Sequence, residues 1–448
     1  MREPPCQRPR WRSSKSDPSA ELRKSTGLLA SLDPDYPEAP SPVMVGAATD
    51  GLAGRRFLIV TAPFGPFGRV LAQALRSRGA DVTRMLFNAG DVLYWRGPGA
   101  IRFKGRAAQW PDQLKALLPD YTDVIVFGEG GAYNQAVLRG AATSGARVWV
   151  LENGYFRPDW VTVERNGVNA SSALPRHRLA YEPPVPETPV TRPVGRILPY
   201  HVLNISIYHL IQLPGRWLFP RYVAPYTQAP WLQCAGHIRR YFGLAFQSRN
   251  RCDADVIARR GPFFIACLQR EGDAQLLRYS RFADNTAFLA EVMNSFADHA
   301  PPEARLVVKN HPLDPGLVNL GLITRALAEE RGLADRVDFI DGGNLAQLCR
   351  ASRGMVVNNS SAALSALGFH TPVKALGQAF FDFEGLTDQK PLDAFWSNPK
   401  EPDQGLFNRF RAHVIARSQV NGNYHEPRSM LPTALSLATV FETRGGPL

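Results

Sequence analysis

Short apolar runs alternate with segments of helical periodicity along most of the chain. In the first such unit, residues 57–60 form a continuous apolar run, Gly65 and Gly68 lie in a turn, and residues 69–78 place apolar side chains at helical spacing. A second apolar run follows at residues 81–87. A strand, a turn, a helix and a strand in this order form a β-loop-α-β unit. We therefore predict a parallel sheet and an α/β fold.

The alternation continues through residues 110–153 and starts again at Pro262. In this second series the predicted strands are residues 263–269, 304–310, 336–340, 354–359 and 372–376. The predicted helices are residues 284–300, 321–333, 344–352 and 360–369. Two Rossmann-like domains joined by a linker predict the architecture of a GT-B-type glycosyltransferase, although other two-domain α/β enzymes show the same alternation.

Composition divides the chain of 448 residues into five predicted segments. They are a disordered basic tail at 1–53, an N-terminal Rossmann-like acceptor domain at 54–182, a linker rich in proline and aromatic residues at 183–260, a C-terminal Rossmann-like nucleotide-sugar domain at 261–395, and a helical tail at 396–448 that packs back.

The linker, residues 183–260, mixes aromatic residues with arginine and histidine. Because Pro214, Pro220, Pro225 and Pro230 interrupt it, we do not expect it to span a bilayer. Two interpretations stay open. The segment lies at a membrane surface, with aromatic rings among the headgroups and arginines on anionic lipid, or it forms an aromatic helix pair packed internally between the domains. Neither a transmembrane helix nor a secretory signal is expected.

The chain is basic, with 52 Lys and Arg against 40 Asp and Glu and a formal net charge of +12. Such a charge favours an anionic partner: nucleic acid, an acidic membrane surface or a phosphorylated substrate. No RNA-binding signature is present, so nucleic acid is not an expected partner. The five cysteines are scattered without a CxxC pair, which favours reduced thiols in the cytoplasm over a zinc site or a disulfide framework.

Two stretches of the second domain predict an anion site. "VVKNHPLDPG" places Lys309 and His311 at a strand end, and "VVNNSSAALSALG" places Ser360 and Ser361 at a strand-to-helix junction. Helix N-termini expose unpaired N–H groups and therefore bind phosphate. Ordinary helix capping by the serines and a loop role for the histidine are the alternatives. Together the two stretches favour a nucleotide-phosphate site.

"CLQREGDAQLLRYS" follows the first strand of the second domain and contains Gln269 and Asp273. Its place at a predicted interdomain cleft makes both residues candidates for binding the donor substrate. A polar loop without ligand contact explains the pattern equally well.

A glycosyl transfer needs a carboxylate that takes a proton from the acceptor hydroxyl. Candidates near strand ends of the first domain are Glu129, Glu152, Asp159 and Glu164. Each is alternatively solvated or paired with an arginine such as Arg157 or Arg165. We choose Glu152, since it stands directly at a strand end before Gly154. "CDADV" imitates an Asp-x-Asp metal motif but lacks a preceding apolar strand, so we predict a surface turn and no metal site.

Several longer stretches resemble capsular polysaccharide proteins of the KpsS/LipB type from Gram-negative bacteria. They include "FLIVTAPFGPFGRVLAQAL", "ENGYFRPDWVTVE", "LQREGDAQL", "VVKNHPLDPG" and "QVNGNYHEPRSMLP", in order from about Arg56 to Pro432. The resemblance implies a GT-B-like fold and a retaining β-Kdo transferase that uses CMP-Kdo as donor substrate, without a further cofactor. It also implies that His311, Pro312, Ser360 and Ser361 hold the cytidine nucleotide, with Lys309 beside them.

The resemblance implies an acceptor and a location as well. The acceptor is an anionic, phosphatidylglycerol-type lipid on which the enzyme starts the capsule linker. The protein would lie peripherally on the cytoplasmic face of the inner membrane, beside other proteins of capsule biosynthesis and export. A non-enzymatic accessory role in capsule export is the alternative.

The chain departs from the family pattern at three places. Asn153 stands where related chains often carry a second carboxylate, "EGGAYN" replaces an Asp-Cys-Arg type of sequence, and "RYS" replaces a more usual His-Ser. The first departure leaves Glu152 as the expected general base.

Overall fold

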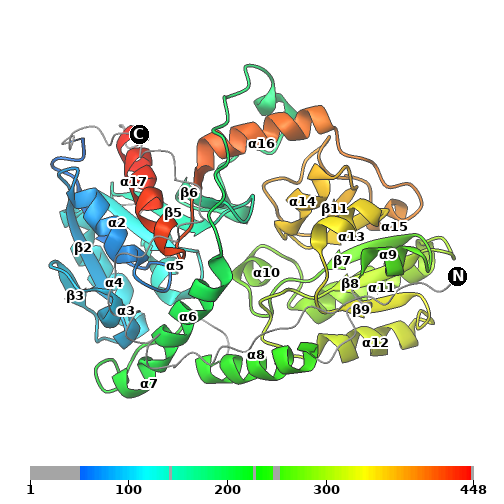
Figure 1. Cartoon of the computed structure of the whole chain (residues 1–448), viewed down its shortest axis with the longest axis horizontal. Coiled ribbons are helices and arrows are strands. Elements are labelled where there is room, and N and C mark those ends of the chain that lie inside the picture. Colours follow the sequence, from blue (N-terminus) through cyan, green and yellow to red (C-terminus); the bar gives the residue numbers. More distant parts are fainter. Residues whose placement is uncertain (1–50, 141–143, 226–228, 246–252, 445–448) are drawn as a thin grey trace, which may run out of the picture. The chain divides into compact units, whose positions relative to one another are not determined.

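The computed structural model describes residues 51–140, 144–225, 229–245 and 253–444 (Figure 1). Two β-sheets organise this part of the chain, one of seven strands and one of five. The predicted tail at 1–53 lies almost entirely outside the described residues. Leu52, however, is fully buried in the core beside the first sheet, so ordered structure reaches into the end of the predicted tail.

The first sheet has the strand order β12-β6-β5-β4-β1-β2-β3. Its strands are β1 (Arg56–Ile59), β2 (Asp81–Leu86), β3 (Ala100–Arg102), β4 (Asp123–Phe127), β5 (Arg147–Asn153), β6 (Trp160–Arg165) and β12 (Gln419–Asn421). Its helices are α2 (Phe67–Arg76), α3 (Ala89–Tyr94), α4 (Trp110–Leu117), α5 (Gly131–Gly140) and α17 (Pro427–Thr443). Short 3-10 turns are η1 (Ala107–Gln109), η2 (Leu118–Asp120), η4 (Asn169–Ser171) and η5 (Arg178–Tyr181).

Apolar cores cover both faces of this sheet. Ile59 and Ile125 lie in one core, whereas their neighbours Leu58 and Val124 lie in the other. Burial on both faces explains why the central strands are continuous apolar runs in the sequence.

The prediction of a purely parallel sheet is wrong at one edge. β6 pairs antiparallel with β5, and β12 pairs antiparallel with β6. Residues 154–159 between β5 and β6 are too few for a crossover helix, so the chain returns beside β5 in the opposite direction. β12 comes from the segment predicted to be a helical tail, and α17 behind it packs on α2.

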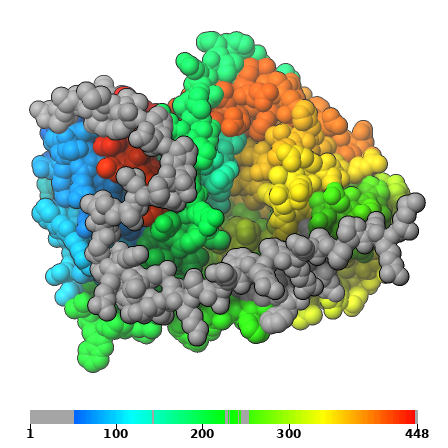
Figure 2. Space-filling model, in the orientation of Figure 1, coloured from blue at the N-terminus to red at the C-terminus, as the bar shows by residue number. Residues whose placement is uncertain are grey.

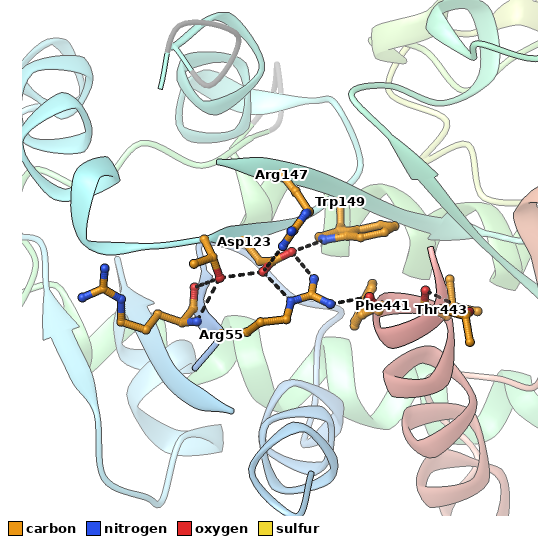
Figure 3. A network of polar contacts seen from close by, with 9 residues as sticks. Arg55, Asp123, Arg147, Trp149, Phe441 and Thr443 are labelled. Atoms are coloured by element: carbon orange, nitrogen blue, oxygen red, sulfur yellow. Dashed lines mark hydrogen bonds and ion pairs between the residues drawn. The ribbon is translucent and has the colours of Figure 1, made fainter. Parts of the chain in front are cut away.

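A buried ionic network joins three strands of the first sheet to α17 (Figure 3). Asp123 is fully buried and accepts hydrogen bonds from Arg55 Nε at 2.9 Å and from Trp149 Nε1 at 2.8 Å. Arg147 lies 3.3 Å from the same carboxylate, and Arg55 also donates to the carbonyl oxygen of Phe441. The starts of β4 and β5 are thereby fixed to the C-terminal helix.

The second sheet has the order β11-β10-β7-β8-β9, and every pairing within it is parallel. Its strands are β7 (Phe263–Cys267), β8 (Arg305–Lys309), β9 (Val337–Ile340), β10 (Gly354–Val357) and β11 (Val373–Ala375). The helices of this half are α9 (Ala254–Ala258), α10 (Ala274–Arg278), α11 (Asn285–His299), α12 (Leu320–Glu330), α13 (Leu345–Ala351), α14 (Ala362–Gly368), α15 (Leu392–Phe395) and α16 (Gln404–Ser418). The predicted α/β fold with two Rossmann-like domains is confirmed. The predicted domain limits stay predictions.

The linker contains three helices: α6 (Ile197–Leu210), α7 (Gln212–Gly215) and α8 (Pro230–Ala245) (Figure 1). Across the described ranges, none of the helices is both long and apolar enough to cross a membrane.

Candidate functional site

The predicted nucleotide-binding residues lie at one edge of the second sheet. Lys309 is the last residue of β8, and Gln269 and Ser360 follow β7 and β10 by a few positions. β7 pairs with β8 on one side and with β10 on the other, all parallel. The carboxyl ends of these three strands therefore meet at the same edge, where open α/β sheets bind ligands.

His311 stands in the turn after β8 as a neutral hydrogen-bond donor. The backbone N–H of Leu313 donates to its Nδ1 at 3.1 Å, so in the neutral ring the proton sits on Nε2. Burial, and after it nearby positive charges, lower the pKa of His311 to about 3. These charges belong to Arg157, Arg270, Lys309 and Arg240.

Arg240 of α8 holds the turn that carries His311. Its guanidinium donates to the carbonyl oxygens of His311 at 3.1 Å and Pro312 at 2.9 Å, and also to that of Asp314. The same guanidinium pairs with Asp341, with Nε 2.7 Å from the carboxylate. Several bonds from one planar cation fix the backbone of the turn.

Lys309 is 7% exposed at the end of β8. No hydrogen bond or ion pair joins its ammonium group to any residue in the described ranges. Its charge still acts on Cys267, because it opposes the effect of burial, which raises the pKa of that thiol to about 11. A buried ammonium group is costly without a compensating anion.

Ser360 and Ser361 lie at the start of α14 and are half-buried. Ser360 Oγ accepts the backbone N–H of Ala362 at 3.3 Å, so this serine does part of the ordinary capping. Ser361 is the N-cap residue, and its hydroxyl makes no capping hydrogen bond. Of the two, Ser361 keeps the hydroxyl that capping does not use.

Gln269 supports the end of β10 from within the protein. Its Nε2 donates to Asn359 Oδ1 at 2.8 Å, and its Oε1 accepts from Asn358 Nδ2 at 2.9 Å. Asn359 in turn donates to the carbonyl oxygen of Gln275 at 3.0 Å. Both ends of the Gln269 amide thus bond to protein, which favours a positioning role over direct ligand contact.

Asp273 caps α10 and accepts the backbone N–H of Gln275 at 2.8 Å. Burial raises its pKa, while Arg270 and Arg157 oppose that rise. Arg157 belongs to the loop after β5 of the first half. The two halves also meet directly here, because the N–H of Ala170 donates to Gln275 Oε1 of α10 at 3.2 Å.

Glu152 stands near the end of β5 and faces the same group. Its carboxylate accepts the N–H of Asn153 at 3.0 Å, and within the described ranges it has no other hydrogen bond. Burial raises the pKa of Glu152 to about 7; Asp273 and Glu129 raise it too, and Arg157 opposes them. A carboxyl with such a pKa can take up and release a proton near neutral pH.

Arg157 is the residue that the sequence did not single out for this site. We treated it only as a partner for carboxylates, yet its charge acts on Glu152, Asp273 and His311 together. No local motif marks it, because its importance depends on the approach of two segments far apart in the chain.

Two of the departures from the family pattern meet in the structure. Tyr279 of "RYS" donates its phenolic hydrogen to Glu129 of "EGGAYN" at 2.9 Å. Glu129 is 3% exposed and also accepts the N–H of Val168 at 2.7 Å and the hydroxyl of Ser171. Glu129 therefore has a structural role, which favours Glu152 over it as the base.

The other two carboxylates are also occupied. Glu164 accepts the hydroxyl of Tyr155 at 2.7 Å and that of Ser172, and burial raises its pKa to about 7. Asp159 accepts the N–H of Val194 at 3.0 Å. Glu152 and Asp159 each accept a single backbone N–H at the carboxylate, and of these two it is Glu152 on which Arg157 and Asp273 act.

A hollow of about 450 Å³ lies beside Tyr279. Its lining carries more positive than negative charge, since it contains three arginines and one aspartate: Arg176, Arg278, Arg281 and Asp382. No local pattern in the sequence marks this hollow, because Arg176 is about one hundred residues away from the other two arginines.

The Asp-x-Asp motif is part of a helix cap. Asp253 is the N-cap of α9 and accepts the N–H of Asp255 at 2.9 Å. No group of three or more His, Cys, Asp or Glu suited to a metal ion occurs in the described ranges. Independence from metal stays a prediction.

Comparison with known proteins gives consistent matches in sequence. Residues 122–425 match the family described as capsule polysaccharide biosynthesis protein. The chain is 32% identical over 389 residues to the capsule polysaccharide export protein KpsS of Escherichia coli, covering 85% of this chain and 99% of that one. It is 33% identical over 396 residues to the capsule polysaccharide modification protein LipB of Neisseria meningitidis serogroup B, covering 83% and 92%.

Solved structures match more distantly. A β-Kdo 2,7 transferase structure of KpsC from Thermosulfurimonas dismutans is 13% identical, with a TM-score of 0.41, over 87% of this chain and 99% of that one.

Proposed function

Because this chain belongs to the family of capsule polysaccharide biosynthesis proteins, we propose that it is a Kdo transferase. It transfers Kdo from CMP-Kdo to a phosphatidylglycerol-type lipid and so begins the linker of the capsule. It acts as a peripheral protein on the cytoplasmic face of the inner membrane, together with other capsule biosynthesis and export proteins.

The observation that carries this proposal is the gathering of positive charge around His311, which shares Arg157 with Glu152. Four cationic side chains lower the pKa of His311, and one of them, Arg157, also acts on Glu152. A group of cations beside a neutral N–H donor suits an anionic donor substrate such as a sugar nucleotide. A carboxyl with a pKa of about 7 across from it suits a general base.

The donor phosphate would lie against Lys309, the Nε2–H of His311 and the start of α14 with Ser361. During transfer the bond between the anomeric carbon of Kdo and the phosphate oxygen breaks, and its electron pair leaves with CMP. The positive charges are in place before the reaction. They stabilise the negative charge that develops on the departing phosphate more than they stabilise the bound donor substrate.

The acceptor hydroxyl forms the new bond to the anomeric carbon. Its proton passes to Glu152, whose carboxylate accepts a single N–H within the described ranges. The pKa of about 7 leaves a large fraction of Glu152 ionised at neutral pH and able to accept that proton.

The direct test is incubation with CMP-Kdo and a fluorescent phosphatidylglycerol analogue, followed by mass spectrometry. The expected product carries one added Kdo, and Glu152→Gln abolishes it while CMP binding remains. An unchanged lipid with intact CMP binding would contradict the proposed acceptor, and normal transfer by Glu152→Gln would contradict the proposed base.

The second candidate is a non-enzymatic accessory in capsule export. The similarity to the capsule polysaccharide export protein KpsS of Escherichia coli and the basic hollow beside Tyr279 favour it. This role predicts no CMP binding and no effect of Glu152→Gln on capsule export. Titration with CMP therefore separates the two candidates.

A further inference from the structure

The linker is a basic stretch without any acidic residue. From Thr188 to Cys252 the sequence contains eight arginines and no Asp or Glu. The formal charge of this stretch is therefore positive, with arginines on either side of the uncharged residues 197–215, whereas acidic residues are spread through the rest of the sequence. Its arginines complement a surface that carries negative charge.

Helix α6 presents an apolar face to the outside. Val202 is 50% exposed, Leu203 53% and Leu210 66%, at the spacing that places residues on one side of a helix. The opposite side is anchored, because Tyr208 is 8% exposed and its hydroxyl accepts a hydrogen bond from Asn88 at 2.6 Å. The outward face of α6 is thus fixed by packing on its inner face.

The exposed apolar surface continues past α6. Leu213 in α7 is 60% exposed, and Trp217 after α7 is 92% exposed. Figure 1 places α7 and α8 along the lower edge of the view, and in Figure 2 green atoms of this stretch are visible on the surface there. An indole so exposed is unusual on a protein surface that faces only water. Tryptophan side chains are common where a protein contacts lipid headgroups.

Helix α8 has the same two-sided character. Trp231 is 63% exposed and Ile238 is 67% exposed, seven positions apart on one side. The other side meets the second half of the chain, since Gly236 approaches the carbonyl of Pro315 and Arg240 holds the His311 turn. Helix α8 thus has an exposed apolar face on one side and contacts the His311 turn with the other.

We infer that the outer faces of α6 and α8, with Trp217 between them, dock on an anionic lipid bilayer. Apolar and indole side chains would enter the headgroup region, while the surrounding arginines meet the negatively charged phosphates. The described helices do not span a bilayer, so the contact lies at the interface. The inference rests on the proposed function only for the identity of the lipid as the acceptor. Docking itself requires no transfer.

Docking would also place the site at the lipid. Arg240 ties α8 to the backbone of His311, so the helix that meets the bilayer also fixes the turn of the nucleotide site. A lipid-linked hydroxyl then reaches Glu152 without leaving the membrane surface. The physical gain is a high local concentration of acceptor.

The test is flotation of the full chain with vesicles of phosphatidylethanolamine and phosphatidylglycerol, against vesicles of phosphatidylcholine. Wild type is expected to float with the anionic vesicles, less as salt rises. The variant Trp231→Glu with Ile238→Glu is expected to lose at least tenfold in partitioning, because both side chains are exposed and their loss leaves the core intact. Leu322→Glu on α12, at a site that is 57% exposed, is the matched control and should float like wild type.

Three outcomes would overturn the inference: wild type that does not bind anionic vesicles, equal binding to both vesicle types, or an equal loss in the Leu322→Glu control. Sedimentation of the same variants tests a second copy as the occupant, and a change from dimer to monomer in the double variant would assign the face to self-association instead. Transfer to a short-chain, monomeric phosphatidylglycerol analogue should be unchanged in the double variant. Failure of transfer with intact docking would therefore count against the proposed function and not against the docking face.

Discussion

The guanidinium of Arg240 in α8 donates a hydrogen bond of 3.1 Å to the carbonyl oxygen of His311 in the turn after β8. Two further carbonyl oxygens of that turn accept from the same group. A residue of the linker therefore sets the backbone of the candidate nucleotide site. The linker is part of the site's support and more than a connection between two domains.

Replacing Arg240 should weaken nucleotide binding without removing any proposed contact to the nucleotide. Arg240→Ala deletes the hydrogen bonds to the turn and leaves Asp341 without its cation, so we expect a loss of about 2 kcal/mol in unfolding free energy. Calorimetric titration should show CMP affinity at least tenfold lower. Arg240→Lys keeps the positive charge but lacks the planar guanidinium. Its CMP affinity should therefore lie between those of wild type and Arg240→Ala.

The neighbouring Arg239 provides the matched control for Arg240. It donates to the carbonyl oxygen of Gly316, beyond the turn that carries His311. Arg239→Ala is expected to bind CMP nearly as wild type does. Equal losses in both variants would show that the effect is general charge and does not depend on the shape of the turn.

His311 should act through its N–H and without a charge. Since burial and nearby cations lower the pKa of His311 to about 3, the free protein holds it neutral at every pH from 5 to 9. His311→Ala should cost about 1.5–3 kcal/mol in CMP binding, the value of a hydrogen bond to a charged group. His311→Gln restores an N–H donor and should recover part of the loss. If Gln and Ala bind CMP equally poorly, the donor role is wrong.

Transfer should depend on the ionisation of Glu152. Burial raises its pKa to about 7, and a general base must be deprotonated, so the transfer rate should rise with pH below about 7 and level off above it. His311 cannot supply this limb, because its pKa of about 3 lies far below. A rate profile without a limb between pH 5 and 8 would argue against Glu152 as the base.

The ionisation of Glu152 should also change the stability of the protein with pH. Its folded pKa is raised above the usual value, so the folded protein binds the proton more tightly than the unfolded chain does, and stability falls as pH rises from about 4.5 through 7. Glu152→Gln should therefore stabilise the protein at pH 8 by on the order of 2 kcal/mol, after allowance for partial exposure, and have little effect at pH 4.5. Denaturant unfolding at the two pH values measures the difference.

The buried network at Asp123 should matter for folding. Asp123→Ala leaves Arg55 without its buried partner, and we expect a loss of about 3–5 kcal/mol in unfolding free energy. The surface pair of Arg331 with Asp298 gives the comparison, since Asp298 is 58% exposed there and Asp298→Ala should cost under about 1 kcal/mol. Chemical denaturation of both variants checks the contrast, and similar losses would contradict it.

Transfer should survive EDTA. Asp253 of the Asp-x-Asp motif accepts backbone N–H groups at the start of α9, so its carboxylate already has a structural role. Activity with and without chelator is the measurement. Complete loss that added metal restores would overturn this expectation.

The alternation of strands and helices could be predicted from the sequence. The central strands are buried on both faces and the helices on one, and each kind of burial gives its own pattern of apolar residues. β7 and β10, for example, form within the ranges expected for them. The edge strands of the first sheet, β3 and β12, were not predicted from the sequence, whereas the edge strands β9 and β11 of the second sheet were. β12 is three residues long and depends on β6, a strand more than two hundred residues earlier, so its pairing has no local signal.

Some residues of the candidate site could likewise be predicted from the sequence, and others only from the tertiary structure. Lys309 and His311 belong to one strand end, so the sequence by itself determined that they lie together, and the order of strands brought Ser361 to the same edge. Only the tertiary structure added Arg157 and Arg240 and showed that Gln269 is bonded internally. It also showed that α6 and α8 each pack one face and expose the other, a choice that the linker sequence left open. Hydrophobic periodicity records which residues are apolar, whereas burial and electrostatic reach depend on which distant segments come to lie beside them.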